Sequence, residues 1–165
     1  MTDRTAFTEE EWALLRLTPL FVAVGVVAAD ASGLFASVKE GIAGANEMAA
    51  ALNANRDLEL FSAFLADRGK PDVPDVDALL GPGSNEARMA NFRTTALEQV
   101  GAAVDLLNRK ASSAETAAFR QLLVRVADSA ANAFKEGGFL GLGGVRVSPK
   151  ERAFIDLVSK AAGIN

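Results

Sequence analysis

The sequence predicts an all-α protein, a single-domain bundle of six to seven helices, and three observations support this prediction. The 165 residues include 32 alanines, the residue with the highest helix propensity. Apolar residues recur at spacings of three and four in most segments, as they do on the buried face of a helix. Three segments, which begin at Thr8, Ser112 and Ser148, match the capping box that opens helices. Because a chain of this length can bury one core, we treat residues 1–165 as one helical domain.

The first capping box, over residues 8–11, opens a helix that we expect to run to about Leu17. Thr18 followed by Pro19 is typical of an N-cap and a first helical position, which either starts a new helix or kinks the first one. Residues 19–29 are apolar on every side of a helix. We therefore expect this segment to lie at the centre of the bundle and to be its most buried part.

Residues 17–38 are the one candidate for a membrane span, because Asp30 is the only charged residue among them. Pro19, two internal glycines and the carboxylate argue against a span, as does the lack of an aromatic belt and of a flanking cluster of lysine and arginine. The uncharged run that precedes Asp30 has thirteen residues, fewer than the ~18 that mark a transmembrane helix. We therefore expect a core helix and no stable membrane insertion.

Two amphipathic helices are expected next, followed by a linker. The helix over residues 33–52 carries its apolar stripe at Leu34, Val38, Ile42, Ala45, Met48, Ala49 and Leu52. The helix over residues 56–67 carries its stripe at Leu58, Phe61, Phe64 and Leu65. Proline and glycine are concentrated in residues 69–84, which are the one plausible mid-chain linker.

Three further helices complete the predicted bundle. Ser84 caps the helix over residues 85–110, whose inner face has Met89, Phe92, Ala96, Val100, Ala103, Val104 and Leu107. The second capping box opens a helix that ends at Gly137, with Phe119, Leu122, Leu123, Val126, Ala130, Ala133 and Phe134 inward. The third box opens the last helix, with Phe154, Leu157, Val158 and Ala161 inward and Gly163 at its end.

The composition excludes many kinds of active site. The chain has no histidine and no cysteine, which excludes Ser-His-Asp triads, thiolate catalysis, the usual zinc sites and disulfides. Its formal charge is −4 and the two signs alternate, so we expect no nucleic-acid partner. Residues 1–11 are acidic, unlike the basic start of a secretory signal, and we expect a cytoplasmic protein. The sequence indicates no cofactor and no metal site.

Asp30 is the carboxylate most suggestive of a site, because a long uncharged run precedes it. Burial without a partner raises the pKa of a carboxyl group, and perturbed carboxylates are markers of functional sites. The alternative is that Asp30 ends its helix at the surface, in a turn where Ser32 caps the following helix.

A loose internal repeat connects Asp30 with Asp128. The segment Val-Ala-Ala-Asp-Ala-Ser-Gly before one Lys-Glu-Gly resembles the segment Arg-Val-Ala-Asp-Ser-Ala-Ala before another. A pseudo-twofold relation between the copies would place Asp30 and Asp128 opposite each other or around one polar pocket. The alternative is a chance match, which alanine-rich helices generate readily.

The glycine-rich residues 137–144 form the loop that we expect before the last helix. The amides around Gly141, Gly143 and Gly144 could hold an anion. However, the segment follows a helix and lacks the spacing of the phosphate-binding glycine motifs. The alternative is a helix stop followed by a connection whose apolar side chains pack on the bundle.

Three functional hypotheses follow. The leading one is a non-enzymatic helical protein that acts through protein–protein contact, as a scaffold, regulator or assembly partner, in a homodimer or with another protein. The second is a carrier of a small apolar ligand in a cavity of the bundle. The third is a carboxylate-based hydrolase or lyase that uses Asp30 and Asp128. Trp12, the only tryptophan, is expected to be an anchor in the core or at an interface.

Overall fold

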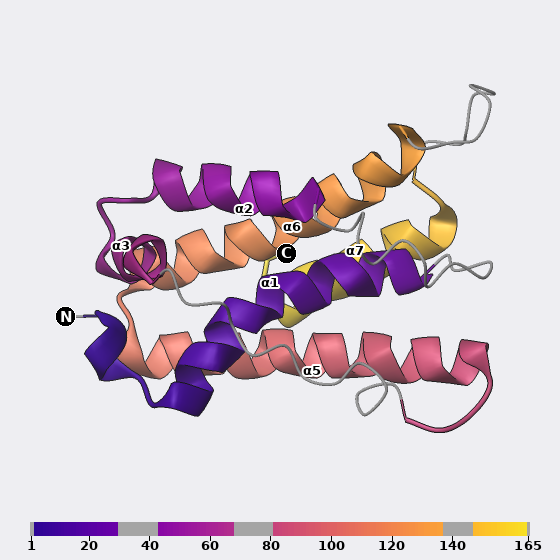
Figure 1. Ribbon diagram of the computed structural model, residues 1–165, viewed down its shortest axis with the longest axis horizontal. Helices are drawn as coiled ribbons and strands as arrows, with labels where there is room; N and C mark the ends of the chain where they lie inside the picture. Colours follow the sequence, from indigo (N-terminus) through magenta and orange to yellow (C-terminus); the bar gives the residue numbers. More distant parts are fainter. Residues whose placement is uncertain (1, 30–42, 68–80, 137–146, 165) are drawn as a thin grey trace.

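The computed structural model describes residues 2–29, 43–67, 81–136 and 147–164, which form a helical bundle (Figure 1). In these ranges the elements are η1 (Arg4–Ala6), α1 (Glu9–Ala29), α2 (Ala43–Ala54), α3 (Glu59–Ala66), α5 (Asn85–Lys110), α6 (Ser113–Glu136) and α7 (Pro149–Ala161). No strand occurs within the described ranges. The predicted all-α bundle is therefore confirmed.

Helix α1 lies at the centre of the bundle, where it packs against α5, α6, α7 and α2. Every residue from Phe21 to Ala29 is buried or half-buried, although Leu20 is exposed. Among the described helices, α1 alone is long and apolar enough to span a membrane, and 67% of its most apolar window is buried inside the protein. Buried core helices of soluble proteins can be equally long and apolar. The burial of residues 21–29 agrees with the core position predicted for residues 19–29.

The chain continues through Pro19 without starting a second helix, because α1 extends over both sides of it. Proline has no amide hydrogen, so it cannot make the helical hydrogen bond to the preceding turn. The predicted role of Thr18 as an N-cap is wrong, since its hydroxyl donates to the carbonyl oxygen of Leu14 at 2.7 Å. Both features bend helices, and Figure 1 shows α1 changing direction along its length.

All three predicted capping boxes are formed. The amide of Glu11 donates to Thr8 Oγ1 at 3.2 Å, and the amide of Thr8 donates to Glu11 Oε2 at 2.9 Å. The boxes at Ser112 and Ser148 make the same reciprocal pair. Ser84 caps α5 as predicted. These local hydrogen bonds position the starts of α1, α5, α6 and α7.

Helix α7 ends at Ala161, and Gly163 lies just beyond it, at the predicted end of the helix. Gly163 has a φ of +72°, a conformation that favours glycine. Its amide donates to the carbonyl oxygen of Lys160 at 3.0 Å, and the amide of Ile164 donates to that of Ser159 at 2.9 Å. Together these bonds are a Schellman motif, which satisfies two of the last carbonyl groups of the helix.

The buried face of α2 and the first residue of α3 differ from the prediction. In α2, Ala51 is 2% exposed while Ala49, predicted to point inward, is exposed. Helix α3 begins at Glu59 and not at residue 56, because the amide of Leu58 closes a turn onto Asn55 at 2.9 Å. The predicted part of the first short helix before residue 43 lies outside the described residues.

Two leucines predicted to be buried are exposed. In α3, Leu65 is 37% exposed and Leu60 is buried in its place. In α7, Leu157 is 48% exposed, whereas Ile155 is buried. Helix α7 packs against α6, α1 and α5, so its inner face is rotated by one residue relative to the predicted stripe.

Aromatic rings fill much of the described core. Phe21 of α1 stacks on Phe92 of α5 with 5.4 Å between ring centroids. At the other end of α1, Trp12 lies 4.8 Å from Phe64, which also contacts the ring of Phe119. These contacts tie α1 to α3 and α5, and α3 to α6, and they place Trp12 in the described core.

Candidate functional site

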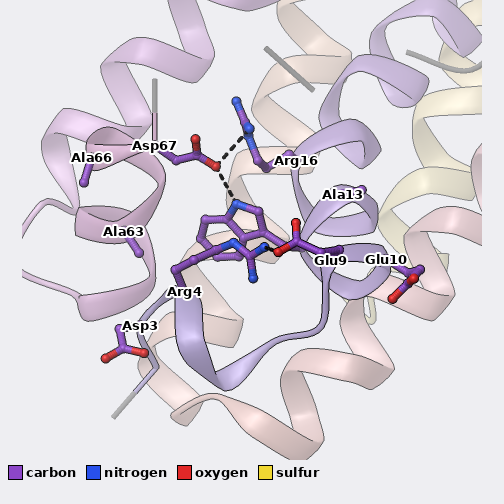
Figure 2. A pocket seen from close by; sticks show the side chains of 10 residues that line it. Asp3, Arg4, Glu9, Glu10, Ala13, Arg16, Ala63, Ala66 and Asp67 are labelled. Atoms are coloured by element: carbon purple, nitrogen blue, oxygen red, sulfur yellow. Dashed lines mark hydrogen bonds and ion pairs between the residues drawn. The ribbon is translucent and has the colours of Figure 1, made fainter. Parts of the chain in front are cut away.

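An open cleft of about 930 Å³ lies where η1 and α1 meet α3 (Figure 2). We call it the α1–α3 cleft. The residues that line it are Asp3, Arg4, Glu9, Glu10, Trp12, Ala13, Arg16, Ala63, Ala66 and Asp67. Trp12 is only 3% exposed and lies deepest, whereas the Glu9 side chain, 88% exposed, lies at the mouth. The lining therefore combines a buried indole and three alanines with charged side chains.

Asp67 connects the two walls of the cleft. Its Oδ2 accepts a hydrogen bond from the indole Nε1 of Trp12 at 2.6 Å and from Nη1 of Arg16 at 2.9 Å, the contacts drawn at Asp67 in Figure 2. Asp67 follows α3, whereas Trp12 and Arg16 belong to α1. Because both donors converge on one oxygen, the indole is held in a defined orientation.

Arg4 lies over one face of the indole. Its guanidinium carbon lies 5.3 Å from the ring centroid of Trp12, within cation–π distance. The guanidinium also pairs with Glu9 and donates to the carbonyl oxygen of Phe7 at 3.0 Å. The Arg4 side chain is 33% exposed, so solvent reaches part of it.

The cleft is electrostatically negative. Four carboxylates and two guanidinium groups line it, which gives a formal charge of −2. Hydrogen bonds from the hydroxyl and the amide of Thr5 lower the pKa of Asp3. Hydrogen bonds from its own backbone amide and from the Thr8 hydroxyl lower the pKa of Glu10. Both carboxyl groups are therefore ionised at neutral pH.

Two ion pairs lie in the lining of the cleft. Arg4 pairs with Glu9, and Arg16 pairs with Asp67. These two ion pairs join neighbouring side chains within the lining. Across the described ranges, no group of three or more acidic side chains is placed to hold a metal ion.

Of the candidate positions chosen from the sequence, the structure describes Asp128 alone. Asp128 lies on α6, half-exposed, and its Oδ1 is 3.7 Å from Nη1 of Arg152 on α7. It is a surface ion pair between two helices. The other candidates lie outside the described residues, so their roles stay predictions: Asp30, Ser32, Gly141, Gly143 and Gly144.

Sequence reasoning missed most of the charged residues of the cleft. Glu9 and Glu10 lie in the first turn of α1, where the helix dipole alone accounts for carboxylates, and no pattern in the sequence singled out Arg4, Arg16 or Asp67. The contacts of Asp67 cross 51 and 55 residues of chain. Spacing along one helix carries no signal for such a contact.

Glu115 also has a larger role than its capping box indicates. The residue is 4% exposed. Its Oε1 accepts from the amide of Leu60 at 2.9 Å, and its Oε2 accepts from the hydroxyl of Thr2 at 2.9 Å and from both donors of Ser112. Burial raises the pKa of Glu115, but these hydrogen bonds outweigh burial and lower it below its ordinary value. Glu115 is fully engaged in holding three segments together.

Comparisons of this chain with models of protein families, with curated proteins and with solved structures found no match. A functional proposal for this protein therefore rests on the geometry of the α1–α3 cleft and on the charges around it.

Proposed function

We propose that this protein acts by binding another protein at the α1–α3 cleft, as a scaffold, regulator or assembly partner, and not as an enzyme. The composition of the cleft supports this proposal. A tryptophan and small apolar residues lie beside charged residues, and two of the latter are arginines. Protein interfaces combine an apolar centre with a polar rim, and tryptophan and arginine supply much of their binding energy.

The contacts beneath the cleft favour binding because they hold its lining in place. Trp12 is fixed by Asp67 at its indole nitrogen and by the rings of Phe64 and Phe7, whose centroids lie 4.8 and 5.7 Å away. A partner that meets a preorganised side chain loses less conformational entropy on binding. The indole of Trp12, 3% exposed beneath Arg4, is therefore a preorganised base of the cleft on which a partner can pack.

The two other hypotheses gain less support from the described residues. A carrier needs an internal cavity, whereas the rings of Phe21, Phe92 and Phe154 pack into the described core. A hydrolase built on two aspartates needs a reactive carboxylate, whereas Asp128 is paired with Arg152 at the surface. Neither observation supports the carrier or the hydrolase. We therefore propose protein–protein contact as the only function.

Site-specific photo-cross-linking tests the proposal. A photoreactive phenylalanine analogue replaces Ala66, which is exposed on α3 and lines the cleft, and in a control it replaces Ala102, which is exposed on α5 outside the cleft. We expect a protein to be captured from Ala66 and not from Ala102. Capture of a second copy of this chain would identify the contact as a homodimer interface.

The captured protein is then purified and its affinity measured. We expect Ala66→Arg to weaken binding at least about tenfold, because a long cation in the cleft blocks the approach to Trp12, while Ala102→Arg has little effect. Equal capture from both positions, or binding indifferent to Ala66→Arg, contradicts the proposal. A non-protein mass retained by the purified protein in native mass spectrometry would instead favour the carrier.

A further inference from the structure

We propose that the partner presents a basic segment, and that one of its arginine or lysine side chains binds against Trp12 in the α1–α3 cleft in place of Arg4. The inference rests on the proposed function, since it takes the cleft to be the contact surface. It adds the chemistry of the partner and a role for Arg4 as an internal occupant of the site.

The first support is that the indole already accepts a cation. The guanidinium of Arg4 lies over the ring of Trp12, the arrangement by which aromatic faces attract cations. The other contacts of Arg4, with Phe7 and Glu9, lie within five residues of it. Arg4 can therefore leave the ring without breaking a contact between the main helices.

The second support is charge complementarity. With Arg4 and Arg16 in place the cleft still has a formal charge of −2. Asp3 and Glu10 accept hydrogen bonds from hydroxyl and amide groups, and in the described part of the chain neither forms an ion pair. Two ionised carboxylates thus remain to attract a basic segment, and they repel an acidic one.

The third support is the space beside the indole. Ala13, Ala63 and Ala66 line the cleft with side chains of one carbon each. The methylene stem of an arginine or lysine can pack along such a surface while its charged group reaches a carboxylate or an aromatic face. The small residues and the carboxylates together match a long cationic side chain.

Intrinsic fluorescence tests the inference directly. Trp12 is the only tryptophan and the chain has no tyrosine, so emission excited at long wavelength reports on the cleft alone. The probes are tetra-arginine and tetra-glutamate peptides with blocked ends. We expect tetra-arginine to change the emission of Trp12 saturably and more weakly as salt is added, and tetra-glutamate to leave it unchanged.

Matched variants separate the cleft from the charge of the whole protein. Arg4→Ala uncovers the indole and removes a competing cation, so we expect the Kd for tetra-arginine to fall about three- to tenfold. Glu10→Lys is expected to raise it by a similar factor. The controls are Arg125→Ala, on an exposed position of α6, and Glu86→Lys, in the first turn of α5 as Glu10 is in that of α1. We expect both to change the Kd by less than about twofold.

The inference is overturned if tetra-arginine leaves the emission unchanged, or if the controls shift the Kd as much as the cleft variants do. Circular dichroism verifies that each variant is folded. If the peptide fails but Ala66 still captures a protein whose binding Ala66→Arg weakens, the proposed contact stands and its basic partner does not. If capture from Ala66 also fails, both proposals fail.

Discussion

Two junctions hold the described helices together by opposite means. In the polar junction, the carboxylate of Glu115 accepts hydrogen bonds from Thr2, Leu60 and Ser112. In the apolar junction, the backbone of α1 at Gly25 lies close to the ring of Phe154 of α7. The polar junction depends on the chemical identity of one carboxylate. The apolar junction depends on how much space the residue at position 25 occupies.

This difference predicts which substitutions each junction tolerates. Removing a buried acceptor leaves its donors without partners, which costs more than the net gain from an ordinary hydrogen bond. An apolar junction has no such donors, and its stability depends on how closely the surfaces pack. The polar junction should therefore respond to changes of charge, and the apolar junction to changes of size.

The largest effect is expected for Glu115→Ala. The change removes the acceptor of the buried Leu60 amide and of the buried Thr2 hydroxyl, and we expect the free energy of unfolding to fall by about 3 kcal/mol. Chemical denaturation measures this difference. Glu115→Gln keeps one acceptor oxygen and should lose less, while Glu98→Ala, at an exposed position of α5, should change stability by less than about 0.5 kcal/mol. A loss at Glu115 no larger than at Glu98 would show that the polar junction adds no stability.

A smaller loss is expected for Gly25→Ala. A Cβ atom at residue 25 would lie 2.6 Å from Cζ of Phe154, so the ring must shift. Overpacking of this kind costs about 1–3 kcal/mol, partly offset by the higher helix propensity of alanine. Thermal unfolding of Gly25→Ala, of Phe154→Leu and of the double variant measures the coupling, and the double variant should be more stable than the sum of the single losses predicts. Strict additivity would contradict the close approach.

Acid should weaken the polar junction and spare the apolar one. The pKa of Glu115 in the folded protein lies below its ordinary value of 4.5. The unfolded chain therefore takes up the proton more readily, so Glu115 stabilises the fold above about pH 4.5 and loses this effect as the pH falls through its folded pKa.

The unfolding free energies of wild type, Glu115→Gln and Gly25→Ala between pH 7 and pH 3 test this expectation. The gap between wild type and Glu115→Gln should narrow with acid, because the wild-type carboxylate becomes protonated. The gap between wild type and Gly25→Ala should stay constant, since neither Gly25 nor Phe154 titrates. A constant gap for Glu115→Gln would contradict the lowered pKa.

The smallest effect is expected at Asp128. Its ion pair with Arg152 is about half exposed on both sides, and exposed pairs contribute about 0–1 kcal/mol. Asp128→Asn should therefore change the unfolding free energy by less than about 0.5 kcal/mol, measured at low and at high salt. A loss as large as that of Glu115→Ala would mean that Asp128 has partners beyond Arg152.

Two of the acidic residues of α6, Asp128 and Glu115, show how far the sequence predicts such contacts. Asp128 was predicted as a candidate site residue because of a loose internal repeat, but it lies in a surface ion pair with Arg152. Glu115 was recognised only as the last residue of a capping box, although it lies at the polar junction. Its box partner Ser112 is three residues away, whereas Leu60 and Thr2 are 55 and 113 residues away. Local patterns predict the first contact and carry no information on the others.

The sequence by itself determined the features that depend on neighbouring residues. The capping boxes at Thr8, Ser112 and Ser148 and the positive φ of Gly163 set helix ends within a few residues, because donor and acceptor lie within one turn. The uninterrupted apolar stretch of α1 likewise made it the central helix, since every face of it needed burial.

Only the tertiary structure decided how the helices are rotated and which side chains meet. Periodicity defines an apolar face to within about one residue, and packing against several neighbours turned Ile155 inward and Leu157 outward in α7. The α1–α3 cleft arose in the same way, because Asp67 reaches Trp12 only after α3 has docked on α1. These contacts join residues that are distant in the chain, and their geometry depends on the packing of the whole bundle.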